Sequence, residues 1–183
     1  MKGIEGFFSE DEGRWYARFA RGLVGGVFVE IGSWRGRSTS FAGPVCKANG
    51  TRLVCVDHWG GSNDDLDVRY RAELAREDVE ATFRRHMADR AIPVEVLAMT
   101  SREASGRFEE RTLGRIFLDG SHDGASVAED LALWFPKLSQ DGILAGHDYD
   151  HKHPELCAAV DAFAAAHGLR VGRGPRSIFV LDR

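Results

Sequence analysis

The chain has 183 residues, of which 43% are hydrophobic and 28% are charged, and its formal net charge is −4. This length and composition predict one domain, or at most two very small ones, and exclude a disordered tail, a collagen and a coiled coil. The negative charge and the lack of a long apolar stretch argue against binding to nucleic acid or a membrane, and the acidic N-terminal segment and scattered cysteines indicate a cytoplasmic protein.

Helical and strand-like hydrophobic patterns alternate along the chain. Ser9 and Glu12 form a capping box that begins a first helix, and two glycines at 25–26 end it. After it, strands and helices are predicted to alternate. The strands are expected over 27–31, 53–57, 94–98, 115–119 and 142–146, followed by two last strands over 169–171 and 177–181. The helices between them are expected over 37–48, 79–89, 100–108, 127–138 and 156–164. This order predicts a single α/β domain, with an N-terminal helical segment (1–24) and a core (25–183) whose sheet is mainly parallel and ends in an antiparallel pair.

A glycine-containing turn follows the first predicted strand. The strand ends near Glu30, and Gly32 and Gly36 precede the next helix. In parallel α/β sheets ligands bind beyond the carboxyl ends of the strands, and glycines there let the backbone approach a ligand and adopt positive φ. A tight turn without a ligand explains the same residues, and the spacing is not that of a dinucleotide-binding fingerprint.

Polar residues also follow the second and third predicted strands. Asp57 follows the second strand, where an acid commonly accepts hydrogen bonds from ribose hydroxyls, so it suggests a nucleoside-bearing cofactor. Thr100 and Ser101 follow the third strand. Thr100 forms a capping box with Glu103, which explains it without a ligand, and a cofactor contact is the alternative.

Two carboxylates and two histidines follow the fourth and fifth predicted strands. Asp119 and His122 come after the fourth strand, and His147 and Asp148 come after the fifth. Carboxylate oxygens suit Mg²⁺, and His122 is a candidate general base near neutral pH. A surface or capping role explains each residue alone, and their joint placement favours a site.

The segment 147–153 is rich in residue types that bind metals. It lacks the H-E-x-x-H pattern and a cysteine partner, so a zinc site is not favoured. His151 and His153 are therefore expected to lie in a solvated loop.

These motifs together resemble those of class I S-adenosylmethionine-dependent methyltransferases. The sequence EIGSWRGRS at 30–38 is similar to motif I of small-molecule O-methyltransferases, including the catechol group. The sequences DGSH at 119–122 and GHDY at 146–149 resemble a compact bacterial subgroup related to macrocin-type sugar O-methyltransferases. The resemblance covers roughly residues 25 to 181.

The resemblance implies a Rossmann-like, doubly wound sheet of seven strands in the order 3-2-1-4-5-7-6, with an antiparallel last strand. It also implies that S-adenosylmethionine is the cofactor. The residues expected to bind it, at its methionine, ribose and adenine ends, are Glu30, Gly32, Ser33, Gly36, Ser38, Asp57, Thr100, Ser101 and Asp119.

The resemblance further implies a divalent metal, Mg²⁺, on Asp119 and the pair His147-Asp148, with Asp119 and His122 as the catalytic residues. The relatives usually carry Asp-Asp or Asp-Asn in this pair, so His147 departs from their pattern. Gly124 stands where the subgroup often has an aromatic residue, which implies a more open pocket.

The expected function is transfer of a methyl group to a hydroxyl oxygen of a small molecule, such as a sugar or a phenol. The alternatives are a metal-independent methyltransferase with His122 as base, a cofactor-binding domain without turnover, and a nucleotide-sugar or NAD-binding module, which the glycine spacing disfavours. The predicted elements use nearly the whole chain. Any cover over the site must therefore come from the N-terminal segment, from 58–75, from 148–154 or from a second subunit of a homodimer.

Overall fold

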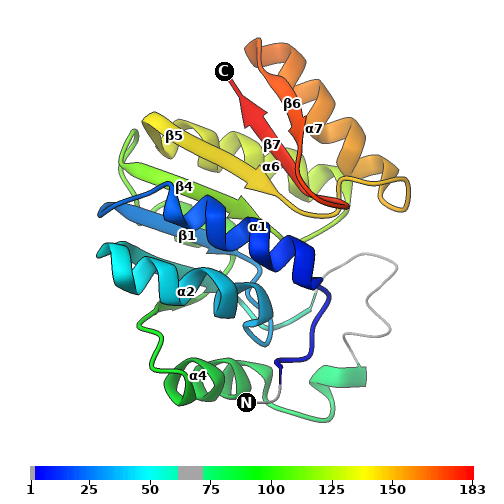
Figure 1. Ribbon diagram of the computed structural model, residues 1–183. Helices are drawn as coiled ribbons and strands as arrows, with labels where there is room; N and C mark the ends of the chain where they lie inside the picture. Colours follow the sequence, from blue (N-terminus) through cyan, green and yellow to red (C-terminus); the bar gives the residue numbers. More distant parts are fainter. Residues whose placement is uncertain (1–2, 62–71) are drawn as a thin grey trace.

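The computed structural model describes residues 3–61 and 72–183, and it contains one seven-stranded sheet (Figure 1). The strand order is β3-β2-β1-β4-β5-β7-β6, as the sequence predicted. The strands are β1 (Val27–Ile31), β2 (Arg52–Asp57), β3 (Glu95–Ala98), β4 (Leu113–Leu118), β5 (Leu138–Gly146), β6 (Arg170–Arg173) and β7 (Phe179–Asp182). β1 to β5 pair in parallel, whereas β7 runs antiparallel to both β5 and β6, which confirms the expected antiparallel end.

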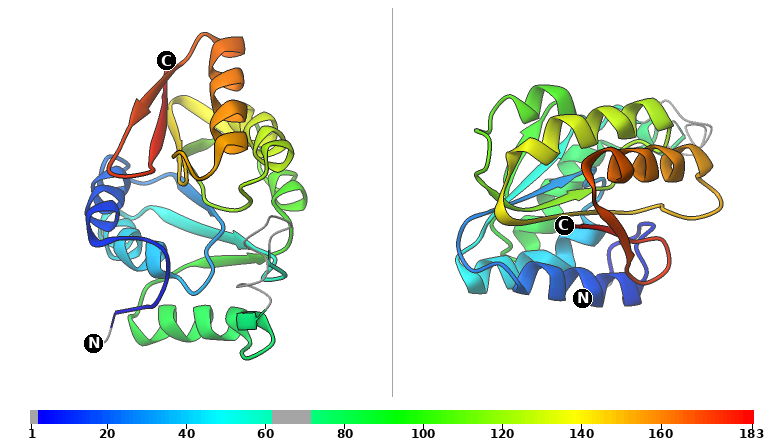
Figure 2. Two further views of the ribbon diagram at one scale, coloured as in Figure 1. Left: turned by 90° about the vertical axis from the view of Figure 1, so that its right-hand side faces the viewer. Right: turned by 90° about the horizontal axis from the view of Figure 1, so that it is seen from above.

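Helices cover both faces of the sheet (Figures 1 and 2). They are α1 (Glu10–Arg21), α2 (Arg37–Asn49), α4 (Val79–Asp89), α5 (Ser101–Ser105), α6 (Gly124–Trp134) and α7 (Pro154–His167). Buried side chains of α1, α2 and α4 form one core with the sheet, and those of α5, α6 and α7 form a second core on the other face. Among the described residues, none of the helices combines the length and the apolar character needed to cross a membrane.

The first helix begins with the capping box that the sequence predicted. The backbone N–H of Glu12 donates to the Ser9 hydroxyl, and the backbone N–H of Ser9 donates to the Glu12 carboxylate. These bonds satisfy N–H groups that have no partner within the helix. They also hold the Glu12 side chain against the body of the protein, where it is buried.

The fifth strand differs from the expectation. The helical pattern predicted over 127–138 ends at Trp134, and a 3₁₀ turn, η1 (Phe135–Lys137), follows it. Pro136 explains this end, because proline has no N–H to continue the helical ladder. Leu138, which the pattern placed on the helix, is instead the first residue of β5 and pairs with Leu113 before a register shift in the strand pair.

Candidate functional site

A cleft lies beyond the carboxyl ends of the parallel strands, where a ligand was expected. Its volume is about 360 Å³, within the range of small-molecule sites. Its wall includes seven of the predicted cofactor-binding residues: Gly32, Ser33, Ser38, Asp57, Thr100, Ser101 and Asp119. Glu30 and Gly36, the other two, lie outside this wall.

Glu30 lies on β1, and its side chain is fully buried beneath α1 and α2. One carboxylate oxygen accepts a hydrogen bond from the Tyr16 hydroxyl at 2.8 Å, and the other accepts from Ser38 at 3.1 Å and Thr39 at 2.7 Å. Burial raises the pKa of Glu30 to about 7, against the lowering effect of the hydrogen bonds from Thr39 and Tyr16. The side chain therefore joins α1 and α2 to the central strand, and direct contact with a cofactor stays a prediction.

The two motif glycines have the positive φ that the sequence predicted, +84° at Gly32 and +86° at Gly36. Their lack of a side chain, however, serves contacts within the protein. A Cβ on Gly32 would lie 2.0 Å from the backbone oxygen of Asp119, and one on Gly36 would lie 2.5 Å from the Met87 side chain. The Gly32 contact brings the ends of β1 and β4 together at the cleft.

Asp57 holds the turn that follows β1. Its Oδ2 atom accepts hydrogen bonds from the backbone N–H groups of Ser33 at 3.0 Å and Trp34 at 2.8 Å, and its Oδ1 atom accepts from Trp59 at 2.7 Å. The carboxylate thus shapes the cleft wall as well as lining it. Its binding to a ribose stays a prediction.

Thr100 and Ser101 lie at the start of α5. The capping box of Thr100 and Glu103 is present, as the sequence predicted. The Ser101 hydroxyl accepts a hydrogen bond from the Trp134 indole at 2.7 Å and donates to the Asp130 carboxylate. Both residues line the cleft, and Ser101 is fixed there by α6.

Glu12, Asp119, His122, His147 and Asp148 meet beside the cleft and are here called the carboxylate–histidine cluster. His147 is at its centre and is buried. Its Nε2 atom lies 2.9 Å from Glu12 Oε1, and its Nδ1 atom lies 3.0 Å from Asp148 Oδ2 and 3.4 Å from Asp119 Oδ1. The expected residues of the two strand ends are therefore brought together, with Glu12 added from α1.

His122 forms a pair with Asp148. Its Nε2 atom lies 3.0 Å from Asp148 Oδ2, and both residues line the cleft. Asp148 has a left-handed backbone, with φ of +60°, and its N–H donates to the Ser177 hydroxyl at 3.3 Å. Such a conformation is uncommon outside glycine and is found at functional sites.

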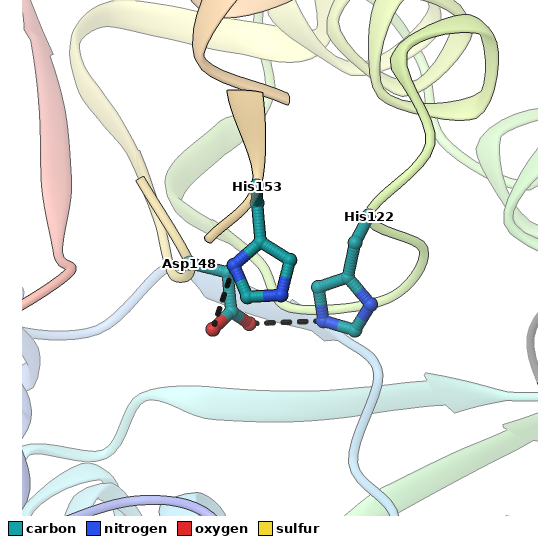
Figure 3. A group of neighbouring side chains, drawn as sticks. All are labelled: His122, Asp148 and His153. Atoms are coloured by element: carbon teal, nitrogen blue, oxygen red, sulfur yellow. Dashed lines mark hydrogen bonds and ion pairs between the residues drawn. The ribbon is translucent and has the colours of Figure 1, made fainter. Parts of the chain in front are cut away.

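Figure 3 shows a second histidine, His153, facing Asp148 from the segment before α7. Its Nδ1 atom lies 3.8 Å from Asp148 Oδ1, and its ring stacks on that of His122 with 4.8 Å between the centroids. His151 is exposed as expected, but His153 is not, since only 14% of its side chain is exposed.

Opposite charges in the cluster shift the pKa values of their neighbours toward the charged forms. Burial alone would lower the pKa of His147, but Asp119, Asp148 and Glu12 raise it far above the ordinary range. Burial would raise the pKa of Glu12 and Asp148, but hydrogen bonds from histidine lower the first to about 2 and the second well below its usual value. Burial raises the pKa of Asp119. Each ring nitrogen of His147 faces a carboxylate, which favours the charged form of the ring.

The predicted Mg²⁺ ligands make a poor set for that ion. Mg²⁺ takes six oxygen ligands in octahedral geometry. Between Asp119 and Asp148 the protein instead presents the Nδ1 atom of His147 within hydrogen-bond distance of Asp148, and Nε2 faces Glu12. A ring nitrogen that donates a proton to a carboxylate has no lone pair for a metal. Mg²⁺ binding stays a prediction that this donor set does not favour.

A family of methyltransferase domains matches residues 29–149, which is more than half of the chain. The chain belongs to this methyltransferase family. The match begins within β1 and ends just after the strand-end residues His147 and Asp148, so it spans most of the cleft and most of the cluster.

Solved structures of methyltransferases share the fold. The O-methyltransferase NovP is 21% identical, with a TM-score of 0.72 over 94% of this chain and 80% of NovP. The SAH-bound Podospora anserina methyltransferase PaMTH1 is 16% identical, with a TM-score of 0.68 over 96% of this chain and 79% of PaMTH1. Cofactor-bound Rv0187 from MTB is 12% identical, with a TM-score of 0.64 over 98% of this chain and 83% of Rv0187. At these identities the likeness concerns the fold.

The sequence named the N-terminal segment of this methyltransferase only as one of four possible covers over the site, and it did not identify which residues reach the cleft. Residues 4–8, here called the N-terminal strap, contribute Glu5, Gly6, Phe7 and Phe8 to the cleft wall. Arg37 holds the strap, since its guanidinium donates to the backbone oxygens of Ile4, at 2.7 Å, and Phe8. The one available signal was the pair of phenylalanines directly before the capping box.

Proposed function

We propose that this methyltransferase transfers a methyl group from S-adenosylmethionine to a hydroxyl oxygen of a small molecule. The observation that carries the proposal is the His122–Asp148 pair on the wall of the cleft, next to the strand ends where the family places its cofactor site. The fold likeness to the O-methyltransferase NovP supports oxygen as the acceptor atom.

The cleft suits S-adenosylmethionine in size and in polar groups. The turn from Gly32 to Ser38 would hold the methionine end, Asp57 would accept hydrogen bonds from the ribose, and Thr100 and Ser101 would lie near the adenine. When bound, this cofactor supplies a methyl group on a positively charged sulfur, which an oxygen nucleophile attacks in line. The protein's main contribution is then to position the two reactants.

His122 acts as the general base. The Asp148 carboxylate lies 3.0 Å from Nε2 and orients the ring, as in other carboxylate–histidine pairs, and the imidazole takes the hydroxyl proton. The acceptor oxygen forms its bond to the methyl carbon as the carbon–sulfur bond breaks. The products are the methyl ether, S-adenosylhomocysteine and a protonated His122.

The cleft can take a sugar or a phenol. Polar residues of the strand ends can hydrogen-bond to hydroxyl groups, and Phe7, a residue that is 58% exposed, offers an apolar face at the wall. We propose a hydroxylated small molecule of one of these classes as the acceptor.

Substitution of the base tests this proposal. His122→Ala should lower kcat by about 10²–10⁴-fold, the usual contribution of general base catalysis, and should change the Kd of S-adenosylhomocysteine less than about twofold. Turnover is measured as release of S-adenosylhomocysteine over a panel of sugars and phenols, and binding by calorimetry. His151→Ala, an exposed histidine nearby, is the matched control and should keep both values.

Two results would contradict the proposal. Near-normal turnover by His122→Ala would exclude this base, and lack of S-adenosylmethionine binding at millimolar concentration would exclude the reaction. Binding of the cofactor without turnover of any acceptor would instead favour a domain that only binds it.

A further inference from the structure

We propose that His147 occupies the place of a divalent cation between Asp119 and Asp148, and that Glu12 positions it there, so that methyl transfer needs no bound metal. The proposal rests on the proposed function. It adds that a histidine, in place of a metal ion, supplies the positive charge between the two aspartates. It assigns Glu12 and His147 as positioning residues that act through Asp148 on the base.

The first argument is the contacts of the ring. His147 faces a carboxylate at each nitrogen, with Glu12 Oε1 at 2.9 Å from Nε2 and Asp148 Oδ2 at 3.0 Å from Nδ1. The Asp119 carboxylate lies 3.4 Å from the same Nδ1. A ring that donates from both nitrogens carries a full positive charge and cannot bind a metal. The charge therefore lies between the two aspartates that would hold an ion.

The second argument is how firmly Glu12 is fixed. Its Oε2 atom accepts the Ser9 N–H of the capping box, so the same carboxylate both begins α1 and binds His147 through Oε1. Ser177 lies 3.5 Å from Oε1. The side chain of Glu12 is 3% exposed, so solvent does not weaken the pair. Removing one partner would leave a buried charge without its counter-charge.

The third argument is that the ring is packed in place. Phe8 of the N-terminal strap lies against His147, with 5.0 Å between the ring centroids. The small void on the other side of the cluster, lined by Leu156 and Phe179, has a volume of about 10 Å³, which is barely enough for one water. His147 itself is buried, so its ring is held in a fixed position between the two aspartates.

For catalysis, the consequence is a continuous series of contacts that links Glu12 on α1 to the base His122. Glu12 holds His147, His147 donates to Asp148, and Asp148 binds the base His122 through the same Oδ2 atom. The orientation of the base therefore depends on α1 as well as on the strand ends.

Metal binding tests the proposal directly. The wild type, titrated with Mg²⁺, Mn²⁺ and Zn²⁺ by calorimetry, should bind none of these ions at the cluster, and its turnover in excess EDTA should stay within about twofold. His147→Asp removes the imidazole ring and adds a third carboxylate beside those of Asp119 and Asp148. This variant should bind Mg²⁺ or Mn²⁺ at least about tenfold more tightly than the wild type, and its turnover should depend on the ion.

Several outcomes would overturn the proposal. These are stoichiometric binding of an ion by the wild type that Asp119→Asn abolishes, loss of wild-type turnover in EDTA with recovery on adding an ion, and a folded His147→Asp that binds no ion. If this variant does not fold, the wild-type titration still decides. None of the binding measurements needs an acceptor, so they remain informative if the proposed reaction is wrong.

Glu12→Gln tests the positioning role with little change of shape. We expect kcat to fall about 10–100-fold, the range for residues that orient a functional group, with KM and S-adenosylhomocysteine binding unchanged. Asp11→Asn, on the same helix turn and exposed, is the matched control and should keep kcat. An unchanged kcat in Glu12→Gln, or an equal fall in both variants, would contradict the role.

Discussion

At the scale of single residues, burial decides what an acid in a familiar motif does. Glu30 and Asp57 end neighbouring strands, and the sequence predicts cofactor contacts for both. Asp57 lines the cleft and holds its turn, whereas Glu30 lies behind the wall among three hydroxyl groups. A strand alternates its side chains between two faces, so residues near the same sheet edge can serve different layers.

Glu30 should make the stability of the protein depend on pH. Its pKa is about 7 in the folded protein and 4.5 in an ordinary setting, so between these values only the folded state keeps the proton. The free energy of unfolding should therefore fall as the pH rises from 5 to 8, by about 2.5 kcal/mol more in the wild type than in Glu30→Gln. Urea unfolding at the two pH values measures this difference, and parallel behaviour of the two proteins would show that Glu30 is ionised throughout.

At the scale of elements, the N-terminal strap closes one side of the cleft. The sequence suggested four sources for a cover, and the structure shows the strap on the cleft wall. Of the polar segment 58–75, residues 62–71 lie outside the described residues. Ile4 and Phe8 are buried, so the strap packs at both ends and is tied to α2 by Arg37.

Arg37→Ala should loosen the strap and weaken ligand binding. The substitution removes two hydrogen bonds from a charged donor to backbone oxygens, each worth about 1.5–3 kcal/mol, of which part is recovered by water. We expect the Kd of S-adenosylhomocysteine to rise about tenfold, equivalent to about 1.4 kcal/mol, by calorimetry. Arg14→Ala removes an exposed ion pair with Asp11 and should leave the Kd unchanged. Equal affinity in Arg37→Ala and wild type would show that the strap does not support the cofactor.

At the scale of the whole molecule, one sheet supplies nearly every part of the site. The glycine turn follows β1, Asp57 ends β2, and most of the carboxylate–histidine cluster follows β4 and β5. Helices on both faces of the sheet hold these strand ends in place. The homodimer expected from the sequence stays a prediction. Since the cleft joins elements from the strap to α6, a ligand there should stabilise the fold as a unit.

S-adenosylhomocysteine should therefore raise the melting temperature. At one hundred times its Kd a ligand adds about 2.7 kcal/mol to the unfolding free energy, which for a chain of this size corresponds to about 5–10 °C. A thermal shift measurement tests this, with NAD as the control ligand that should have no effect. An equal shift with NAD, or none with S-adenosylhomocysteine, would favour a different ligand class.

The sequence by itself determined the strand order through its resemblance, the alternation of elements, the capping boxes of α1 and α5, and the strand ends at which polar residues gather. These features depend on local patterns, because each one is set by residues that lie close together in the sequence. The sequence predicted in this way that Asp119, His122, His147 and Asp148 lie together, because parallel strands end at one edge of the sheet.

Only the tertiary structure decided which of these residues touch, and from which side. Glu12 and His147 are 135 positions apart, and no local pattern relates them. Glu12 is read in the sequence as a helix cap, and the packing of α1 on the sheet makes it the partner of a buried histidine. The same packing places Phe8 on that ring and Glu30 behind the cleft, because contact between distant segments depends on how the layers meet.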